Sequence, residues 1–198
     1  MSKGNWYKRP SNSVLVESIR MKTFSEAMTI GSASTAEAWT IFDRLEPISV
    51  SFMFGNWKGV SFPTNHPLDG VLEAYHWHGK RFVNAEHVHP LVFQTLSGGT
   101  TSVNPLWLLP AISWLERLPV PQSQAIGRFF QLCLPLLSTS SSTARLRLIH
   151  YRGKESAAML YDNLPINDIF RQVDAQTVFS VMDLKGMEQP FFFVLQRE

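Results

Sequence analysis

The clearest hydrophobic pattern in the chain is helical and lies at residues 34–46. Its apolar positions are three and four residues apart, as on the buried face of an amphipathic helix: Ala38, Ile41, Phe42 and Leu45. Ser34 followed by Glu37 is the signature of a capping box, which satisfies backbone N–H groups at a helix start. Pro47 ends the pattern, because proline cannot continue a helix. The sequence therefore predicts a helix over residues 34–46.

Most other apolar runs are short and rich in β-branched or aromatic residues, which is typical of strands. In the first half they lie at residues 48–53, 55–62, 71–78, 80–83 and 91–95, with Gly79 at a hairpin bend. In the second half they lie at residues 146–151, 156–161, 177–183 and 191–196. We interpret residues 165–172 as a short helical or loop segment whose Ile166, Ile169 and Phe170 face inward. Roughly eight short strands with peripheral helices predict a mainly β fold, an antiparallel β-barrel or strongly bent sheet.

An insert separates the two strand-rich regions. Five of the twelve prolines lie between residues 105 and 135, and residues 123–134 predict a helix with apolar residues on one face. We expect this insert to pack on the sheet as a lid, or to form a mobile cover over a ligand cavity. The predicted organisation is a basic, partly disordered tail (1–33), a helix with a first β-region (34–95), the insert and a polar linker (96–143), and a second β-region completing the same barrel (144–198).

Composition excludes several classes of protein. With 44% hydrophobic and 17% charged residues, the 198-residue chain is globular, because disordered chains carry more charge and fewer aromatics. A single cysteine, Cys133, excludes an intrachain disulfide and a cysteine-based zinc site.

Charge and hydropathy bear on the partners and the cellular location of the protein. The excess of positively charged residues lies in the first 25 residues and not on the folded body, so we expect no nucleic-acid partner. Trp6 and Tyr7 beside two basic residues would allow at most weak contact with an anionic membrane surface. No apolar run approaches the length of a membrane span and no signal peptide is evident, so we expect a cytoplasmic protein.

Two groups of motifs, in order along the chain, carry a family resemblance. The first runs Gly55-Asn56-Trp57-Lys58-Gly59, Pro63, His66-Pro67-Leu68, Trp77, Gly79-Lys80-Arg81-Phe82 and His89-Pro90-Leu91. It resembles the GXWXG domain family. The second includes Tyr151-Arg152-Gly153, Tyr161-Asp162, Asp168, Phe170-Arg171 and the closing Phe-rich strand. It is similar to the uncharacterised domain that usually follows GXWXG.

The resemblance implies a shape more than a reaction. The Gly-x-Trp opening is similar to that of calycin barrels, in which a Trp on the first strand plugs the barrel floor. Trp57 would be that plug, with Arg171 or Arg197 stacked on it. Gly55 and Gly59 would permit a bulge or close backbone approach around the indole. The alternative is a strand Trp in an ordinary core.

The histidines suggest alternative sites. His76 with His78, and His87 with His89, each place two imidazoles on one face of a strand, and the two pairs could gather around zinc. One of these, or His66, could instead be an axial haem ligand, as in nitrobindin-like relatives. We expect neither a metal nor a cofactor.

The carboxylates suggest a structural pair. Asp162, Asp168 and Asp174 are six residues apart, and we expect Asp162 to pair with Arg171 across one end of the barrel. No nucleophile elbow, phosphate-binding loop or dinucleotide motif is present in the sequence.

These observations favour a non-catalytic barrel that binds a hydrophobic or amphipathic ligand, such as a fatty acid or phospholipid. The apolar side chains that would contact the acyl chain are Trp77, Phe82, Met159, Tyr161, Met182 and Phe192. A basic residue, Lys80, Arg81 or Arg171, would bind the head group. We expect the insert to cover the outer face of the final strand. The alternatives left open are an isomerase or hydrolase using His89 or Asp168 as general base, the haem or metal barrel, and an interaction scaffold, including a homodimer.

Overall fold

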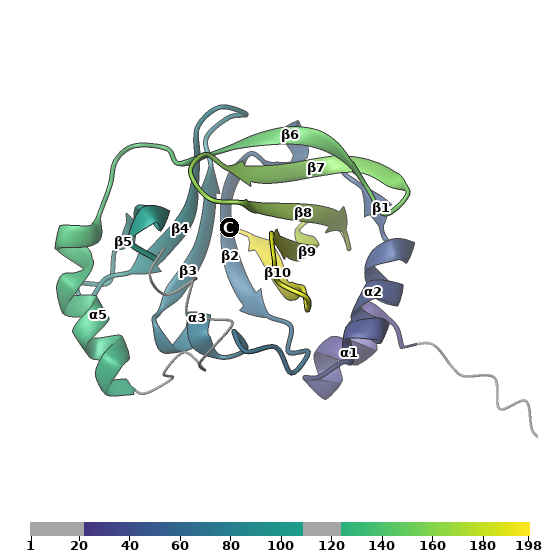
Figure 1. The fold of residues 1–198 in the computed structure, drawn as a ribbon, viewed down its shortest axis with the longest axis horizontal. Helices are drawn as coiled ribbons and strands as arrows, with labels where there is room; N and C mark the ends of the chain where they lie inside the picture. Colours follow the sequence, from purple (N-terminus) through teal and green to yellow (C-terminus); the bar gives the residue numbers. More distant parts are fainter. Residues whose placement is uncertain (1–21, 109–123) are drawn as a thin grey trace, which may run out of the picture.

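The computed structural model describes residues 22–108 and 124–198, and eight antiparallel strands within them close into a barrel (Figure 1). Around the ring the order is β8, β7, β6, β4, β3, β2, β10 and β9, and β9 pairs with β8 to complete it. The predicted antiparallel barrel is confirmed, and both β-rich regions contribute to the one ring. Its strands are β2 (Gly55–Ser61), β3 (Trp77–Phe82), β4 (Val88–Gln94), β6 (Ala144–Tyr151), β7 (Lys154–Tyr161), β8 (Ile166–Gln172), β9 (Thr177–Leu184) and β10 (Phe191–Arg197).

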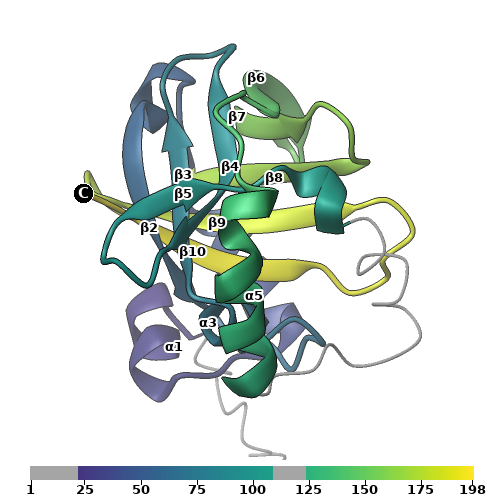
Figure 2. The same cartoon turned by 90° about the vertical axis from the view of Figure 1, so that its left-hand side faces the viewer.

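Two short strands and several helices surround the ring. β1 (Glu46–Pro47) extends the sheet beside β8, and β5 (Thr100–Ser102) pairs with β4. Helices α1 (Phe24–Ile30) and α2 (Thr35–Arg44) lie on one side of the barrel, and α5 (Gln124–Leu137) lies on the opposite side (Figures 1 and 2). The remaining helical segments are α3 (Val71–Ala74) and the single 3-10 turns η1 (Ser51–Met53) and η2 (Pro105–Leu108). No helix in the described ranges is long and apolar enough to cross a membrane.

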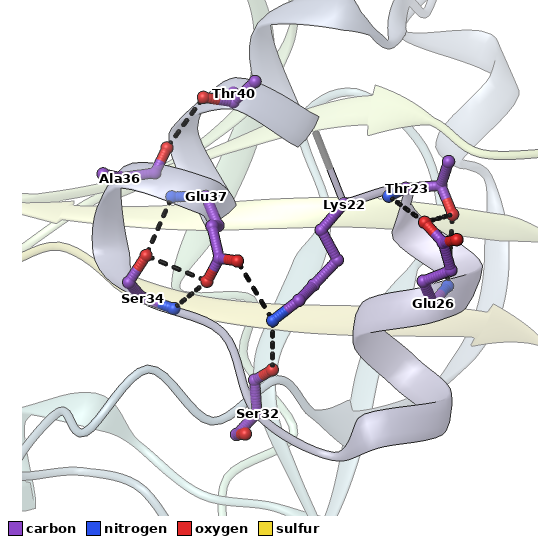
Figure 3. Close-up of polar contacts among 8 residues, drawn as sticks. All are labelled: Lys22, Thr23, Glu26, Ser32, Ser34, Ala36, Glu37 and Thr40. Carbon is purple, nitrogen blue, oxygen red and sulfur yellow. Dashed lines mark hydrogen bonds and ion pairs between the residues drawn. The ribbon is translucent and has the colours of Figure 1, made fainter. Parts of the chain in front are cut away.

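Figure 3 shows how α1 and α2 begin. Ser34 caps α2 and forms the predicted capping box with Glu37, and Thr23 forms a second capping box with Glu26 at α1. Lys22 joins the two helix starts, because its Nζ lies 3.1 Å from Glu37 Oε1 and donates to the carbonyl of Ser32. The backbone N–H of Ser34 and, next, Lys22 lower the pKa of Glu37. Helix α1 was not predicted, because residues 1–33 were assigned to the tail.

Alternate residues of each strand divide the core into two layers. On β10, Phe191 and Phe193 face the inner core of the barrel, whereas Phe192 faces an outer core under α1 and α2. The Phe192 ring centroid lies 5.0 Å from that of Trp39 on α2. The expectation that the insert covers this face is therefore wrong, since α5 packs instead against Phe93 on β4.

Three local predictions were also wrong. Residues 48–53 form no strand but cross one end of the barrel, where the backbone of Ile48 bonds to β7. Residues 71–74 are helical after Gly70, which has a φ of 79°. Strand β3 continues through Gly79, so no hairpin bend lies there. Residues 166–172 are a strand, so Ile169 faces the outer core. Residues 109–123 lie outside the described residues, as do residues 1–21 of the basic tail.

Candidate functional site

A bulge in β3 turns Lys80 into the barrel. The register between β3 and β4 shifts on both sides of Gly79, whose φ is 154°. A side chain at Gly79 would collide with the backbone of Trp57, so only glycine fits this approach. Because of the bulge, Lys80 faces inward, whereas Arg81 faces outward.

Inside the barrel Lys80 forms an ion pair with Asp168 of β8. Lys80 Nζ lies 2.8 Å from Asp168 Oδ2, and the two side chains are only 4% and 2% exposed. Lys80 Nζ also donates to the carbonyl of Pro90 at 3.2 Å. Since β3 and β8 are four steps apart in the eight-stranded ring, the pair bridges opposite walls of the barrel.

Three aromatic rings surround the ammonium group. Lys80 Nζ lies 5.2 Å from the ring centroid of Phe193, 5.6 Å from that of Trp77 and 5.7 Å from that of Tyr161. The negative faces of such rings stabilise a cation by roughly 0.5–2 kcal/mol each. The charged pair thus lies within an otherwise aromatic environment.

Several polar atoms of the inner core have no hydrogen-bond partner in the described structure. They are Asp168 Oδ1, the Ser180 hydroxyl on the adjacent β9 and the Trp77 indole Nε1. Burial raises the pKa of Asp168, while Lys80 opposes this shift. Burial and the charge of Asp168 raise the pKa of Tyr161 well above its ordinary value. Unpartnered buried polar groups are rare in folded proteins, so these three atoms distinguish this part of the inner core.

One end of the barrel is sealed. Trp57 is fully buried there, and its indole N–H donates to the carbonyl of Met53 in η1 at 2.7 Å. Of the two arginines considered, Arg197 covers it, with its guanidinium carbon 4.2 Å from the ring centroid. Arg197 also donates to the carbonyls of Phe52 and Phe54, which ties β10 to the segment that closes this end.

At the other end, apolar side chains are only partly buried. We call this set the rim. Its members lie at the ends of β3, β7 and β9 and in the β2–β3 connection, and they pack on the inner core. They are Leu68, Leu72, Trp77, Tyr161 and Met182. Gly59 creates space for Trp77, because a Cβ there would overlap the indole ring. The GXWXG motif thus serves both ends, with Trp57 sealing one and Gly59 seating Trp77 at the other.

The structure separates the residues predicted to contact a ligand. Trp77, Lys80, Tyr161 and Met182 come together near Asp168, and Phe82 and Met159 lie fully buried in the same inner core. Phe192 and Arg171 were predicted wrongly. Phe192 is fully buried in the outer core.

Arg171 is held between β8 and α2. Its guanidinium stacks 4.8 Å from the Phe42 ring and donates to the carbonyl of Tyr151. It is fully buried on the outer side and cannot reach an interior ligand. The expected Asp162–Arg171 pair is also wrong, because exposed Asp162 lies 3.5 Å from Arg145.

The histidines do not converge. The described residues contain no group of three or more His, Cys, Asp or Glu side chains that could hold a metal ion. His78 pairs with Glu198, and His87 bonds to Asn84. His89 lies beside Arg81 on the outside of the wall, so it cannot act together with Asp168. The zinc cluster considered for His76, His78, His87 and His89 is therefore not formed.

His66 has a structural position. Its Nδ1 accepts from the backbone N–H of Leu68, and its Nε2 bonds to the carbonyl of Gln189 at 3.1 Å. These bonds join the β2–β3 connection to the β9–β10 turn. Burial lowers the pKa of His66, which favours the neutral imidazole.

Arg81 lines a polar hollow of about 340 Å³ on the outer face of the wall. The hollow lies between β2, β3 and the β4–β5 turn and is also lined by Asn56, His78, Thr100 and Glu198. Lys80 contributes to its lining as well. Lys80 and Arg81 were predicted as equivalent candidates for a ligand head. Both border this hollow, but only Lys80 places its ammonium group inside the barrel, against Asp168.

Comparison with known proteins agrees with this architecture. A family model described as GXWXG protein matches residues 40–98, and one described as Domain of unknown function (DUF4334) matches residues 142–197. A solved structure, a protein from Thermomonospora curvata, is 31% identical, covers 88% of this chain and 95% of its own, and superposes with a TM-score of 0.63. No curated protein matches the chain. Lys80 lies in the first matched region and Asp168 in the second. The two matched regions and the solved structure together show that the chain belongs to the GXWXG family, with its paired DUF4334 domain completing the barrel.

Proposed function

We propose that the protein binds a small, largely apolar molecule at the rim, with one uncharged oxygen of that molecule hydrogen-bonded to the Lys80–Asp168 pair. The observation that carries this proposal is the buried pair itself, whose Asp168 Oδ1 has no partner among the described residues. The partly exposed rim residues supply apolar contact around it. Ligand sites commonly combine an apolar lining with a few fixed polar groups.

The electrostatics favour a neutral ligand over the fatty acid or phospholipid suggested by the sequence. The positive charge of Lys80 is already neutralised by Asp168 at 2.8 Å. A carboxylate or phosphate head would place a second negative charge beside Asp168 in a buried site, which is strongly unfavourable. A hydroxyl or carbonyl oxygen can accept from Lys80 without adding charge.

A set of ligands of one shape tests this proposal. Acetophenone, 1-phenylethanol, benzoate and ethylbenzene share a phenyl ring and differ in the attached oxygen, and calorimetric titration measures their affinities. We expect the ketone and the alcohol to bind roughly 10- to 150-fold more tightly than ethylbenzene, since a hydrogen bond to a charged group contributes roughly 1.5–3 kcal/mol. We expect benzoate to bind most weakly.

Variants locate the binding site. Lys80→Met should abolish the preference for the oxygenated ligands, whereas Arg81→Met, its neighbour on the outer face, should retain it. Equal affinity of all four ligands for the wild-type protein would contradict a role for the pair. Tightest binding of benzoate would contradict the neutral-ligand argument.

A further inference from the structure

The two oxygens of Asp168 have different surroundings. Oδ2 accepts from Lys80 at 2.8 Å, whereas Oδ1 is buried without any hydrogen-bond partner in the described structure. Its lone pairs are therefore free to take a proton from a bound molecule. Burial also raises the pKa of Asp168, which makes its carboxylate a stronger base than one in water.

Lys80 has one hydrogen-bond donor to spare. An ammonium group carries three N–H donors, and the described structure provides two oxygen acceptors, on Asp168 and Pro90. The ammonium nitrogen itself lies among the rings of Trp77, Tyr161 and Phe193. A carbonyl oxygen placed there would accept from a cation in a site of low dielectric, where such stabilisation is strongest.

The acceptor and the donor belong to one ion pair, so a single functional group can contact both. A carbonyl oxygen and its α-carbon are two bonds apart, as are the two oxygens of a carboxylate. A ketone that binds Lys80 through its oxygen would therefore present its α-carbon toward Asp168 Oδ1, because Oδ2 already lies against Lys80. Proton abstraction next to a carbonyl needs this combination of base and oxyanion stabiliser.

We propose that this site catalyses enolisation of a small apolar ketone, with Asp168 as general base and Lys80 as the group that stabilises the enolate oxygen. Oδ1 takes the α-proton, the C–H electron pair forms the C=C bond, and the carbonyl π pair moves to the oxygen, which accepts from Lys80. The proton on Oδ1 then exchanges with solvent, and the reverse step returns a solvent-derived proton to carbon. In D₂O the net change is replacement of the α-proton by deuterium, and no oxidant or reductant is needed. This inference rests on the proposed function, because the ketone must first bind at the pair.

Deuterium exchange of acetophenone, followed by proton NMR in D₂O, tests the proposal. We expect the wild-type protein to accelerate loss of the methyl signal over buffer alone, and Asp168→Asn to lose at least about tenfold of this rate, since general bases contribute roughly 10²–10⁴-fold. Lys80→Met should show a comparable loss. Glu155→Gln, which alters an exposed carboxylate on β7, should exchange at the wild-type rate.

One control needs no variant and so does not depend on the folding of a substituted protein. Benzophenone has a carbonyl group but no α-proton, and saturating benzophenone should suppress the exchange catalysed by the wild-type protein. Exchange that persists under benzophenone, or that is equal in wild-type and folded Asp168→Asn protein, would overturn the proposal. Binding of both ketones without exchange would overturn enolisation and leave the proposed binding function intact. Failure of both ketones to bind would overturn the two together.

Discussion

Replacing Gly59 with alanine should disturb the rim through a single contact. A Cβ at Gly59 would have three carbons of the Trp77 ring within 2.5 Å, although carbon atoms in contact normally lie about 3.5–4.0 Å apart. The indole or strand β2 must therefore move by roughly 1 Å or more. The backbone at Gly59 is ordinary, since no positive φ occurs there, so the collision alone determines the effect.

The size of the effect follows from overpacking. Forcing extra carbon into a packed site costs about 1–3 kcal/mol, and for a chain of this length that lowers Tm by roughly 2–12 °C. Gly99→Ala is the matched control, because its nearest neighbour would be Thr95 Oγ1 at 3.6 Å. There we expect no loss, or a gain of about 0.4–1 kcal/mol from reduced freedom of the unfolded chain.

A double-mutant cycle assigns the cost to the ring. Urea unfolding gives the free energy of unfolding for wild type, Gly59→Ala, Trp77→Ala and the double variant. If the collision is with the indole, Gly59→Ala costs little once Trp77 is absent, and the coupling is about 1 kcal/mol or more. An equal cost of Gly59→Ala in both backgrounds would refute the proposed contact.

Four further predictions concern the fold. Trp57→Ala should cost about 3–5 kcal/mol, seen as a large fall in Tm, because it opens a cavity at the sealed end; an unchanged melting curve would contradict its burial. Ser34→Ala should cost about 0.5–2 kcal/mol in urea unfolding by removing the α2 cap; a cost near zero would contradict the capping box. The pKa of His66 is lowered in the folded state, so the unfolded chain binds the proton more readily, and the free energy of unfolding should fall as pH drops below about 6.5. The dependence of this free energy on pH should be weaker in His66→Asn; an equal dependence in that variant would contradict the assignment to His66. Lys80→Met and Asp168→Leu should each cost about 3–5 kcal/mol, whereas the double variant should be more stable than either; additive costs would argue against the pair.

Local signals in the sequence predicted local structure well. The cap at Ser34 and the apolar spacing that follows it suffice to place α2, because both depend on residues within one or two helical turns. Short strands separated by turns likewise predicted the barrel class. The aromatic run of β10 had to place rings on both faces of one strand, and the structure shows both faces buried.

Lys80 and Asp168 were both named from the sequence, but their pairing was not predicted, because it depends on strand phase. We interpreted residues 165–172 as helical or loop, which does not determine the faces on which Asp168 and Arg171 lie. In a strand, residues three apart point to opposite faces, so Asp168 enters the barrel while Arg171 lies under α2. The bulge at Gly79 had the same effect on β3, because it changed which of Lys80 and Arg81 faces inward.

Stability does not explain why the barrel contains the Lys80–Asp168 pair. Buried ion pairs are often matched or surpassed in stability, by about 1–4 kcal/mol, by apolar residues of similar volume. The neighbouring inner core is built from such residues, including Phe193 and Met159. The unpartnered Oδ1 adds a further cost of roughly 1–3 kcal/mol. Where a protein keeps charged residues in an otherwise apolar core in spite of this cost, the reason is usually function. For this reason we assign the site to the pair, ahead of the outer hollow, whose polar side chains line an open surface, and ahead of the histidines, which the structure keeps apart.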